Sequence, residues 1–165
     1  QVVQPQPAPP APLTVGTNVT LDGKAFRVVS HRIVEFTKVN ARWNSRQYQV
    51  TDDAGQTNLL VLRAVPDAQR WQLLRPVAPV RPPTPQMAAA MRVGDAVTLD
   101  DFSGRVQELF MSSVLTNRSD FAATGAATGL TYHYLATSQT GQLLVSWTGE
   151  QVHFLRGDFV TKHTP

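Results

Sequence analysis

A ten-residue stretch occurs twice in this chain, and the repeat constrains the fold more than any other feature. The stretch at residues 13–22 returns 78 positions later, at residues 91–100. Six of its ten positions are identical: Val15/Val93, Gly16/Gly94, Val19/Val97, Thr20/Thr98, Leu21/Leu99 and Asp22/Asp100. Self-similarity at a fixed offset indicates repeated structural units. We therefore predict two tandem copies of one small domain.

Alternating apolar and polar residues predict that each copy is built from β-strands. In the first copy Val19 and Leu21 alternate with polar residues, and Asp22-Gly23 is a strong hairpin-turn pair. Further runs of strand character follow at residues 25–36, 46–50, 58–62 and 71–74. Short strands with turns about every ten residues are typical of a small barrel or sandwich. We expect residues 38–45, which include Trp43, to be a polar connection.

Prolines mark the expected boundaries of the two copies. Residues 1–12 hold five of the twelve prolines, and residues 76–85 hold five more. Proline fixes φ and lacks an N–H, so these segments are predicted to be extended spacers. The predicted fold class is all-β, with two tandem small antiparallel β-barrel or sandwich domains joined by a Pro-rich linker. The expected organisation is a Pro-rich N-terminal arm (1–12), copy one (13–75), a linker with a short helix (76–90) and copy two (91–165).

The first copy resembles a bacterial family known as domain of unknown function 4178. The matching positions are Leu13, Gly16, Asp22, Gly23, Phe26, Arg27, Val28, Trp43, Tyr48 and Trp71. Gln47 stands where that pattern has an acidic residue, and the second copy has Asp101 and Val152 in place of Gly23 and Trp71. The resemblance covers about sixty residues, and it implies a small β fold with no known activity.

Composition bears on the compartment and on the partners. There is no cysteine, so disulfides and thiolate chemistry are excluded, and no run approaches the roughly 20 apolar residues of a membrane span. The chain begins at Gln1 and continues into a Pro-rich tract, from which we expect an exported bacterial protein, whether periplasmic, at the cell surface or extracellular. The net charge is +3, with a basic first copy and an acidic second copy. This asymmetry fits packing within the chain, contact between chains, or two surfaces that differ by chance.

The sequence offers no convincing catalytic or metal-binding constellation. Its histidines are His31, His133, His153 and His163, with no partner at metal-ligand spacing, although His133 and His153 are in strands that could meet across a sheet. The paired acids Asp52-Asp53 and Asp100-Asp101 fall at predicted turns, where Asp is favoured. There is no P-loop, nucleophile elbow or dinucleotide motif. We therefore expect a protein that is not an enzyme and that has no cofactor or metal.

Two sets of residues are candidates for interaction. The arm residues Val2, Val3, Pro5 and Pro7 would dock on another copy of the chain by strand addition, which would give a homo-oligomer or filament. Basic and aromatic residues interleave in a candidate ligand surface formed by Phe36, Lys38, Arg42, Trp43, Arg46 and Phe121. Self-assembly of an extracellular or envelope structural subunit is the predicted function. The alternative is a monomeric binding module for cell-wall glycan or another extracellular polymer, and no nucleic-acid partner is expected.

Overall fold

The computed structural model describes residues 13–65, 68–117 and 130–164, and these form an all-β protein with one short helix. The elements in chain order are β1 (Asn18–Leu21), β2 (Lys24–Lys38), β3 (Ala41–Thr51), β4 (Thr57–Val65), β5 (Ala68–Val77), α1 (Pro85–Ala89), β6 (Ala96–Leu99), β7 (Phe102–Asn117), β8 (Thr131–Ser138), β9 (Gly141–Trp147), β10 (Val152–Phe159) and β11 (His163–Thr164). We call β1–β5 the first half and β6–β11 the second half.

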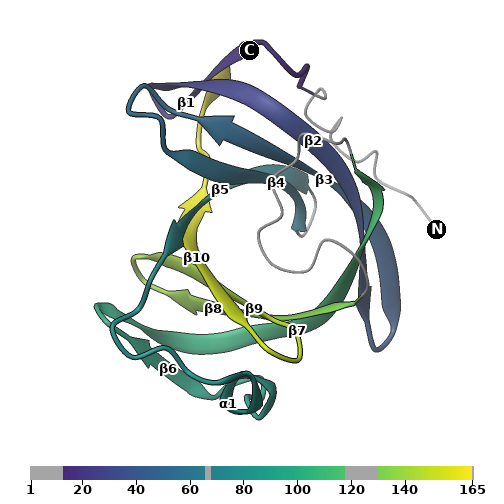
Figure 1. The fold of residues 1–165 in the computed structure, drawn as a ribbon, viewed down its shortest axis with the longest axis vertical. Helices are drawn as coiled ribbons and strands as arrows, with labels where there is room; N and C mark the ends of the chain where they lie inside the picture. Colours follow the sequence, from purple (N-terminus) through teal and green to yellow (C-terminus); the bar gives the residue numbers. More distant parts are fainter. Residues whose placement is uncertain (1–12, 66–67, 118–129, 165) are drawn as a thin grey trace, which may run out of the picture.

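The strands form one antiparallel sheet that closes into an eight-stranded barrel. The sheet order is β11-β1-β2-β3-β4-β5-β10-β9-β8-β7-β6, and an additional pairing joins β2 to β7. Figure 1 shows the closed ring, with β2 beside β7 on one side and β5 beside β10 on the other. The expectation of two separate small barrels or sandwiches is therefore wrong. Each half supplies four strands to one barrel. Neither copy of the repeat, taken alone, indicates that its strands pair with those of the other copy.

The repeated stretch has the same backbone geometry in both halves. Gly16 and Gly94 have φ of 92° and 93°, and Asp22 and Asp100 have φ of 49° and 50°. Positive φ is uncommon for residues other than glycine, and Asp is among the residues that tolerate it in turns. Each repeated Asp therefore holds a tight turn between a short strand and a long one, β1–β2 in the first half and β6–β7 in the second.

The repeated aspartates also bind chain segments from the opposite half. Asp22 Oδ1 accepts hydrogen bonds from the backbone N–H of Thr161 at 3.0 Å and of Lys162 at 2.8 Å, just before β11. Asp100 Oδ1 accepts one from the backbone N–H of Val80, just after β5, at 3.2 Å. The segment that leaves each half is thus bound to the other half, and the halves are interlocked beyond the barrel seams.

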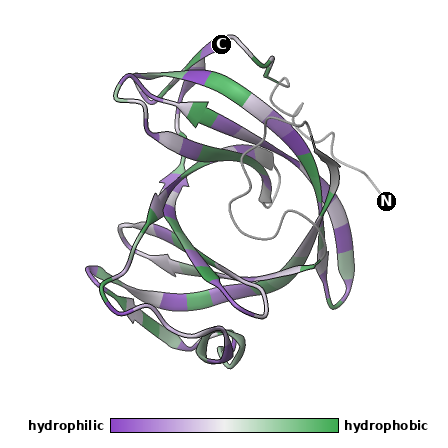
Figure 2. Ribbon diagram, viewed as in Figure 1, coloured by the Kyte–Doolittle hydropathy of each residue, from purple (hydrophilic) through white to green (hydrophobic). Residues whose placement is uncertain are grey.

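A β-bulge lets each long strand serve two hydrophobic cores. The register shifts between Val28 and Ser30 in β2, and between Val106 and Glu108 in β7. Because side chains alternate between the faces of a strand, an extra residue moves the following side chains to the other face. Val28 and Val106 therefore belong to two cores outside the barrel, whereas Val34 and Phe110 belong to a core within it. Figure 2 shows the resulting bands of hydrophobic and hydrophilic residues along the strands.

Two local expectations are corrected by the strand pairing. Trp43 lies within β3 opposite Phe36, not in a polar connection, because β2 and β3 continue as a long hairpin. The expected linker begins inside the barrel, since Pro76 and Val77 of β5 pair with Leu155 and Phe154 of β10. The expected short helix is present as α1, where the Thr84 side chain caps the N–H of Met87.

The seam between β5 and β10 requires a glycine. A Cβ at Gly157 would lie 1.8 Å from the carbonyl oxygen of Leu73, whereas a Cβ at Gly149 would meet no atom within 4 Å. We predict that Gly157→Ala lowers the free energy of unfolding by roughly 1–3 kcal/mol, as overpacking does. Gly149→Ala is the matched control and should have little effect. Urea denaturation measures both, and equal stability of the two variants would contradict the close seam.

Candidate functional site

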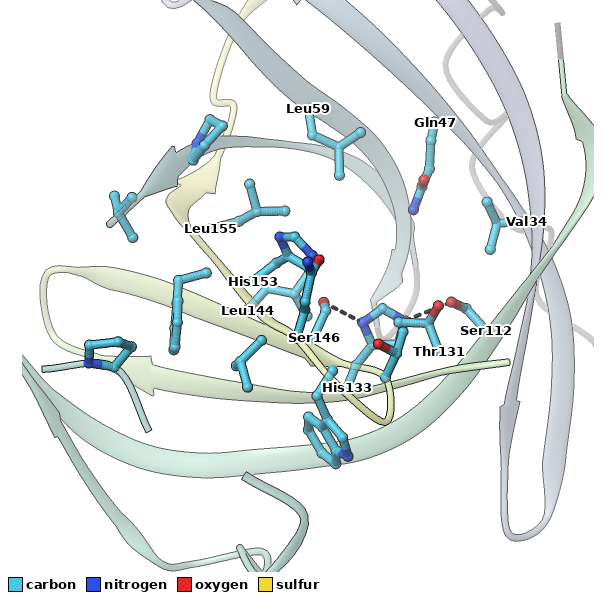
Figure 3. A pocket seen from close by; sticks show the side chains of 18 of the residues that line it. Val34, Gln47, Leu59, Ser112, Thr131, His133, Leu144, Ser146, His153 and Leu155 are labelled. Atoms are coloured by element: carbon cyan, nitrogen blue, oxygen red, sulfur yellow. Dashed lines mark hydrogen bonds between the residues drawn. The ribbon is translucent and has the colours of Figure 1, made fainter. Parts of the chain in front are cut away.

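A partly open cavity of about 640 Å³ lies within the barrel and is lined mainly by residues of the second half. Its apolar walls include Val34, Leu59, Val114, Leu144 and Leu155. Leu59 and Leu144 are buried members of the barrel core, and Leu155 and Val114 pack against them. Figure 3 shows Val34, Leu59, Leu144 and Leu155 around the space together with a group of polar side chains. The cavity is thus an apolar chamber with polar groups concentrated on part of its wall.

Serine and histidine side chains form a row across the second half of the barrel. His133 of β8 is opposite Ser146 of β9, and Ser146 is opposite His153 of β10. His133 Nδ1 lies 2.6 Å from Ser146 Oγ, and His133 Nε2 lies 2.6 Å from Ser112 Oγ of β7. Figure 3 shows His133 between the two hydroxyls. We call Ser112, His133, Ser146 and His153 the serine–histidine row.

His133 is neutral at physiological pH. Burial lowers its pKa to about 3, and the positive charges of Arg32 and Arg63 add to the effect. A neutral imidazole has one N–H and one bare nitrogen. One of the two serines therefore donates to His133, and the other accepts from it and keeps its own O–H available to donate. The row is a hydrogen-bonding surface that carries no charge at His133.

His153 ends the row with an unused hydrogen-bonding atom. Its Nε2 is buried and has no hydrogen-bond partner within the described part of the chain. Buried polar atoms usually have a partner, and one without a partner costs free energy. The Nε2 atom belongs to a residue that lines the cavity.

The facing wall carries a cation held by an amide. Arg32 of β2 donates from Nε to Gln47 Oε1 of β3 at 2.9 Å, and both residues line the cavity. Burial lowers the pKa of Arg32 to about 10, so the guanidinium stays charged at neutral pH. The described residues that line the cavity include no Asp or Glu.

Three residues of the predicted ligand surface lie together. They adjoin a second polar cluster, which consists of Lys38, Arg63 and Glu108. Phe36 and Trp43 stack with ring centroids 5.6 Å apart, and Lys38 Nζ lies 5.6 Å from the centre of the Trp43 ring. Phe36 is buried in the barrel core. Lys38 bonds Glu108 of β7 at 2.8 Å, and Arg63 of β4 bonds the same carboxylate at 2.5 Å. The group lines a smaller hollow of about 190 Å³.

The other predicted site residues are not part of this group. Arg42 and Arg46 alternate with Trp43 along β3, and they approach Glu35 at 3.8 Å and His31 at 3.3 Å respectively. Phe121 and the arm residues Val2, Val3, Pro5 and Pro7 lie outside the described residues. The candidate ligand surface as a whole, which includes Phe121, stays a prediction.

Sequence reasoning missed the serine–histidine row and the Arg32–Gln47 pair. A partial signal was present, since His133 and His153 were in strands that could meet across a sheet. They do face the same interior, but Ser146 of β9 lies between them. The polar residues of the row become a pattern only once the order β7-β8-β9-β10 is known.

No cluster of three or more His, Asp or Glu side chains suited to a metal occurs among the described residues. The described part of the chain has no helix with the length and hydrophobicity needed to cross a membrane.

Comparison with family models, with curated proteins and with solved structures finds no match to this chain. The resemblance of the first copy to domain of unknown function 4178 stays a prediction.

The burial of His133 predicts a pH-dependent stability. Its folded pKa of about 3 lies below its unfolded value near 6.5, so below pH 6.5 the unfolded chain binds a proton that the folded chain does not. Stability should therefore fall as the pH falls from 6.5 towards 3, by up to about 1.4 kcal/mol per pH unit for this group. Urea unfolding at pH 7, 6 and 5 measures the slope above the range in which carboxylates titrate.

His133→Gln tests the assignment, because Gln keeps hydrogen bonds to both serines and does not titrate. The variant should have a shallower pH dependence, whereas the control His163→Gln, at an exposed position, should keep the original one. An unchanged slope in His133→Gln would mean that another group causes it.

We predict that Glu108 makes a large contribution to stability through the second polar cluster. Burial tends to raise its pKa, but Lys38 and Arg63 outweigh burial, so the pKa lies below its ordinary value. Glu108→Gln would leave two cations without their carboxylate, at a cost approaching the roughly 3–5 kcal/mol seen when a buried pair is broken. Asp101→Asn is the control, because Asp101 pairs with Arg156 but its side chain is 83% exposed, and about 0–1 kcal/mol is expected. Equal losses measured by urea denaturation would contradict this ranking.

Proposed function

We propose that this chain is a non-enzymatic binding protein whose barrel holds one small, largely apolar molecule. The observation that carries the proposal is the cavity of about 640 Å³ inside the barrel. Small-molecule sites are typically about 300–1,000 Å³, mostly apolar, with a few polar groups that orient the ligand. Eight strands give an interior wide enough to hold one small ligand when side chains do not fill it.

The polar groups of the cavity favour binding over catalysis. A serine beside a histidine resembles part of a hydrolase site, but a general base should have a pKa near the working pH. The pKa of His133 is about 3, so taking up a proton there is costly. The imidazole is also hydrogen-bonded on both nitrogens to hydroxyls, and no carboxylate of the described residues is bonded to it. We therefore assign the row to recognition of a ligand.

Filling the cavity tests the proposal. N-phenyl-1-naphthylamine, a neutral apolar dye that fluoresces in apolar sites, should bind the full chain saturably with a stoichiometry of one. Leu155→Trp places bulk on the cavity wall and should weaken dye binding about tenfold or more, a change of about 1.4 kcal/mol or more. Val93→Trp is the control, because Val93 is 63% exposed and lies outside the lining.

Circular dichroism would show that both tryptophan variants keep the strand content of the original chain. Absence of saturable dye binding to the original chain would overturn the proposal. Equal binding by Leu155→Trp and the original chain would also overturn it, because the dye would then bind elsewhere.

A second proposal, self-assembly of an exported structural subunit, is favoured by one feature of the sheet. Among the described strands β6 pairs only with β7, whereas its counterpart β1 pairs with both β2 and β11. An open edge of this kind accepts an added strand from another chain. The arm around Val2 and Val3 is the proposed donor, and export of the protein is part of the same proposal.

A further inference from the structure

We propose that the molecule held in the barrel is a neutral amphiphile whose polar end is a hydroxyl, bound at Ser146 of the serine–histidine row. This inference rests on the proposed binding function and names the chemical class of the ligand. Two features of the cavity wall support it. They are the hydrogen bonds that hold His133 and the small number of charged side chains in the lining.

Ser146 has a hydrogen bond to offer in either tautomer of His133. Its Oγ lies 2.6 Å from His133 Nδ1, and the neutral ring carries a proton on one nitrogen only. If Nδ1 carries the proton, Ser146 accepts from it and can donate its own O–H to a ligand. If Nδ1 is bare, Ser146 donates to it and can accept from a ligand through a remaining lone pair.

A hydroxyl complements Ser146 in both of these states, because it donates as well as accepts. An ether or ester oxygen only accepts, so it fits only the state in which Ser146 donates to the ligand. Ser146 is also opposite His153 across β9 and β10, and Figure 3 shows Ser146 between His133 and His153. The hydroxyl of the ligand is therefore placed at the middle of the row.

The charges of the lining favour a neutral head group over an ionised one. The described residues that line the cavity include no Asp or Glu, and Arg32 is their one Lys or Arg. The Arg32 side chain is engaged within the protein, where its Nε donates to Gln47 Oε1 at 2.9 Å. Burying an ion without a partner costs far more free energy than burying a neutral group that is hydrogen-bonded.

Apolar side chains begin directly beside the row. Leu144 precedes Ser146 by two residues in β9, Leu155 follows His153 by two residues in β10, and the two leucines are opposite each other. Both line the cavity and belong to the barrel core or pack against it. Burial of an apolar tail against them is favoured by the hydrophobic effect. A hydroxyl at one end and an apolar body at the other specify an amphipathic alcohol.

Three probes that share one tail test the head group. Dodecan-1-ol, 1-methoxydodecane and dodecanoate are each titrated against the dye-loaded chain at pH 8, below their aggregation limits. Dodecanoate should need a concentration about tenfold or more higher than dodecan-1-ol to displace the dye, because its charge is buried without a partner. The ether serves as the reference for the hydroxyl, since it keeps the tail and one acceptor but has no O–H.

Ser146→Ala tests the position of the hydroxyl. The measured quantity is the half-displacement concentration of dodecan-1-ol divided by that of 1-methoxydodecane. This ratio should rise roughly three- to tenfold in Ser146→Ala, as expected for the loss of one hydrogen bond. Ser146→Thr keeps a hydroxyl and should keep the ratio of the original chain. Ser103→Ala is the matched control, because Ser103 is exposed and lies outside the cavity lining.

Ser146→Cys provides a second route if Ser146→Ala does not fold. A thiol is a weak hydrogen-bond partner, so this variant should also raise the ratio. An unchanged ratio in a folded Ser146 variant without a hydroxyl would overturn the inference and leave the proposed function standing. Displacement by dodecanoate at a lower concentration than dodecan-1-ol would overturn the neutral head group. Failure of the dye and of all three probes to bind would overturn both the inference and the proposed function.

Discussion

Pairing between the two halves is the constraint on which the structure depends. Neither half closes alone: β2 must pair with β7 and β5 with β10 before any barrel interior exists. Each seam joins strands at the same position in their halves, second with second and fifth with fifth. The aspartates of the repeated turns then bind the segment that leaves the opposite half. The tandem duplication that the repeat led us to expect stays a prediction.

The bulges in β2 and β7 make a shared core possible in a chain of this size. A domain of roughly seventy residues buries a small fraction of its surface on folding, so its stability is marginal. By turning its side chains to the other face after Val28, β2 contributes to a core outside the barrel and then to the core inside it. β7 does the same after Val106. One long strand thus stabilises two layers, and the polar residues that follow the bulge point into the barrel.

Structural features that depend on neighbouring residues could be predicted from the sequence. Features that depend on pairing between distant strands could not. The turn at Asp22-Gly23, the all-β character and the helix near Pro85 follow from local patterns, and the structure contains each of them. Trp43 was misplaced because its strand is defined by pairing with Phe36. Closure of the barrel depends on contacts between residues as far apart as Thr37 and Met111. The serine–histidine row has no local signal, because its members come from four strands.

Charged residues of the basic and acidic halves meet inside the barrel. Lys38 and Arg63 of the basic half share Glu108 of the acidic half. These ion pairs across the interior neutralise part of the charge difference between the halves. Arg32 of the basic half lies at the larger cavity, where the other half contributes serines and the neutral His133. At the offset of 78 residues Glu108 corresponds to Ser30, and Ser112 corresponds to Val34. The two halves thus contribute different polar residues to the interior, which holds an ion-pair cluster in one place and the serine–histidine row in another.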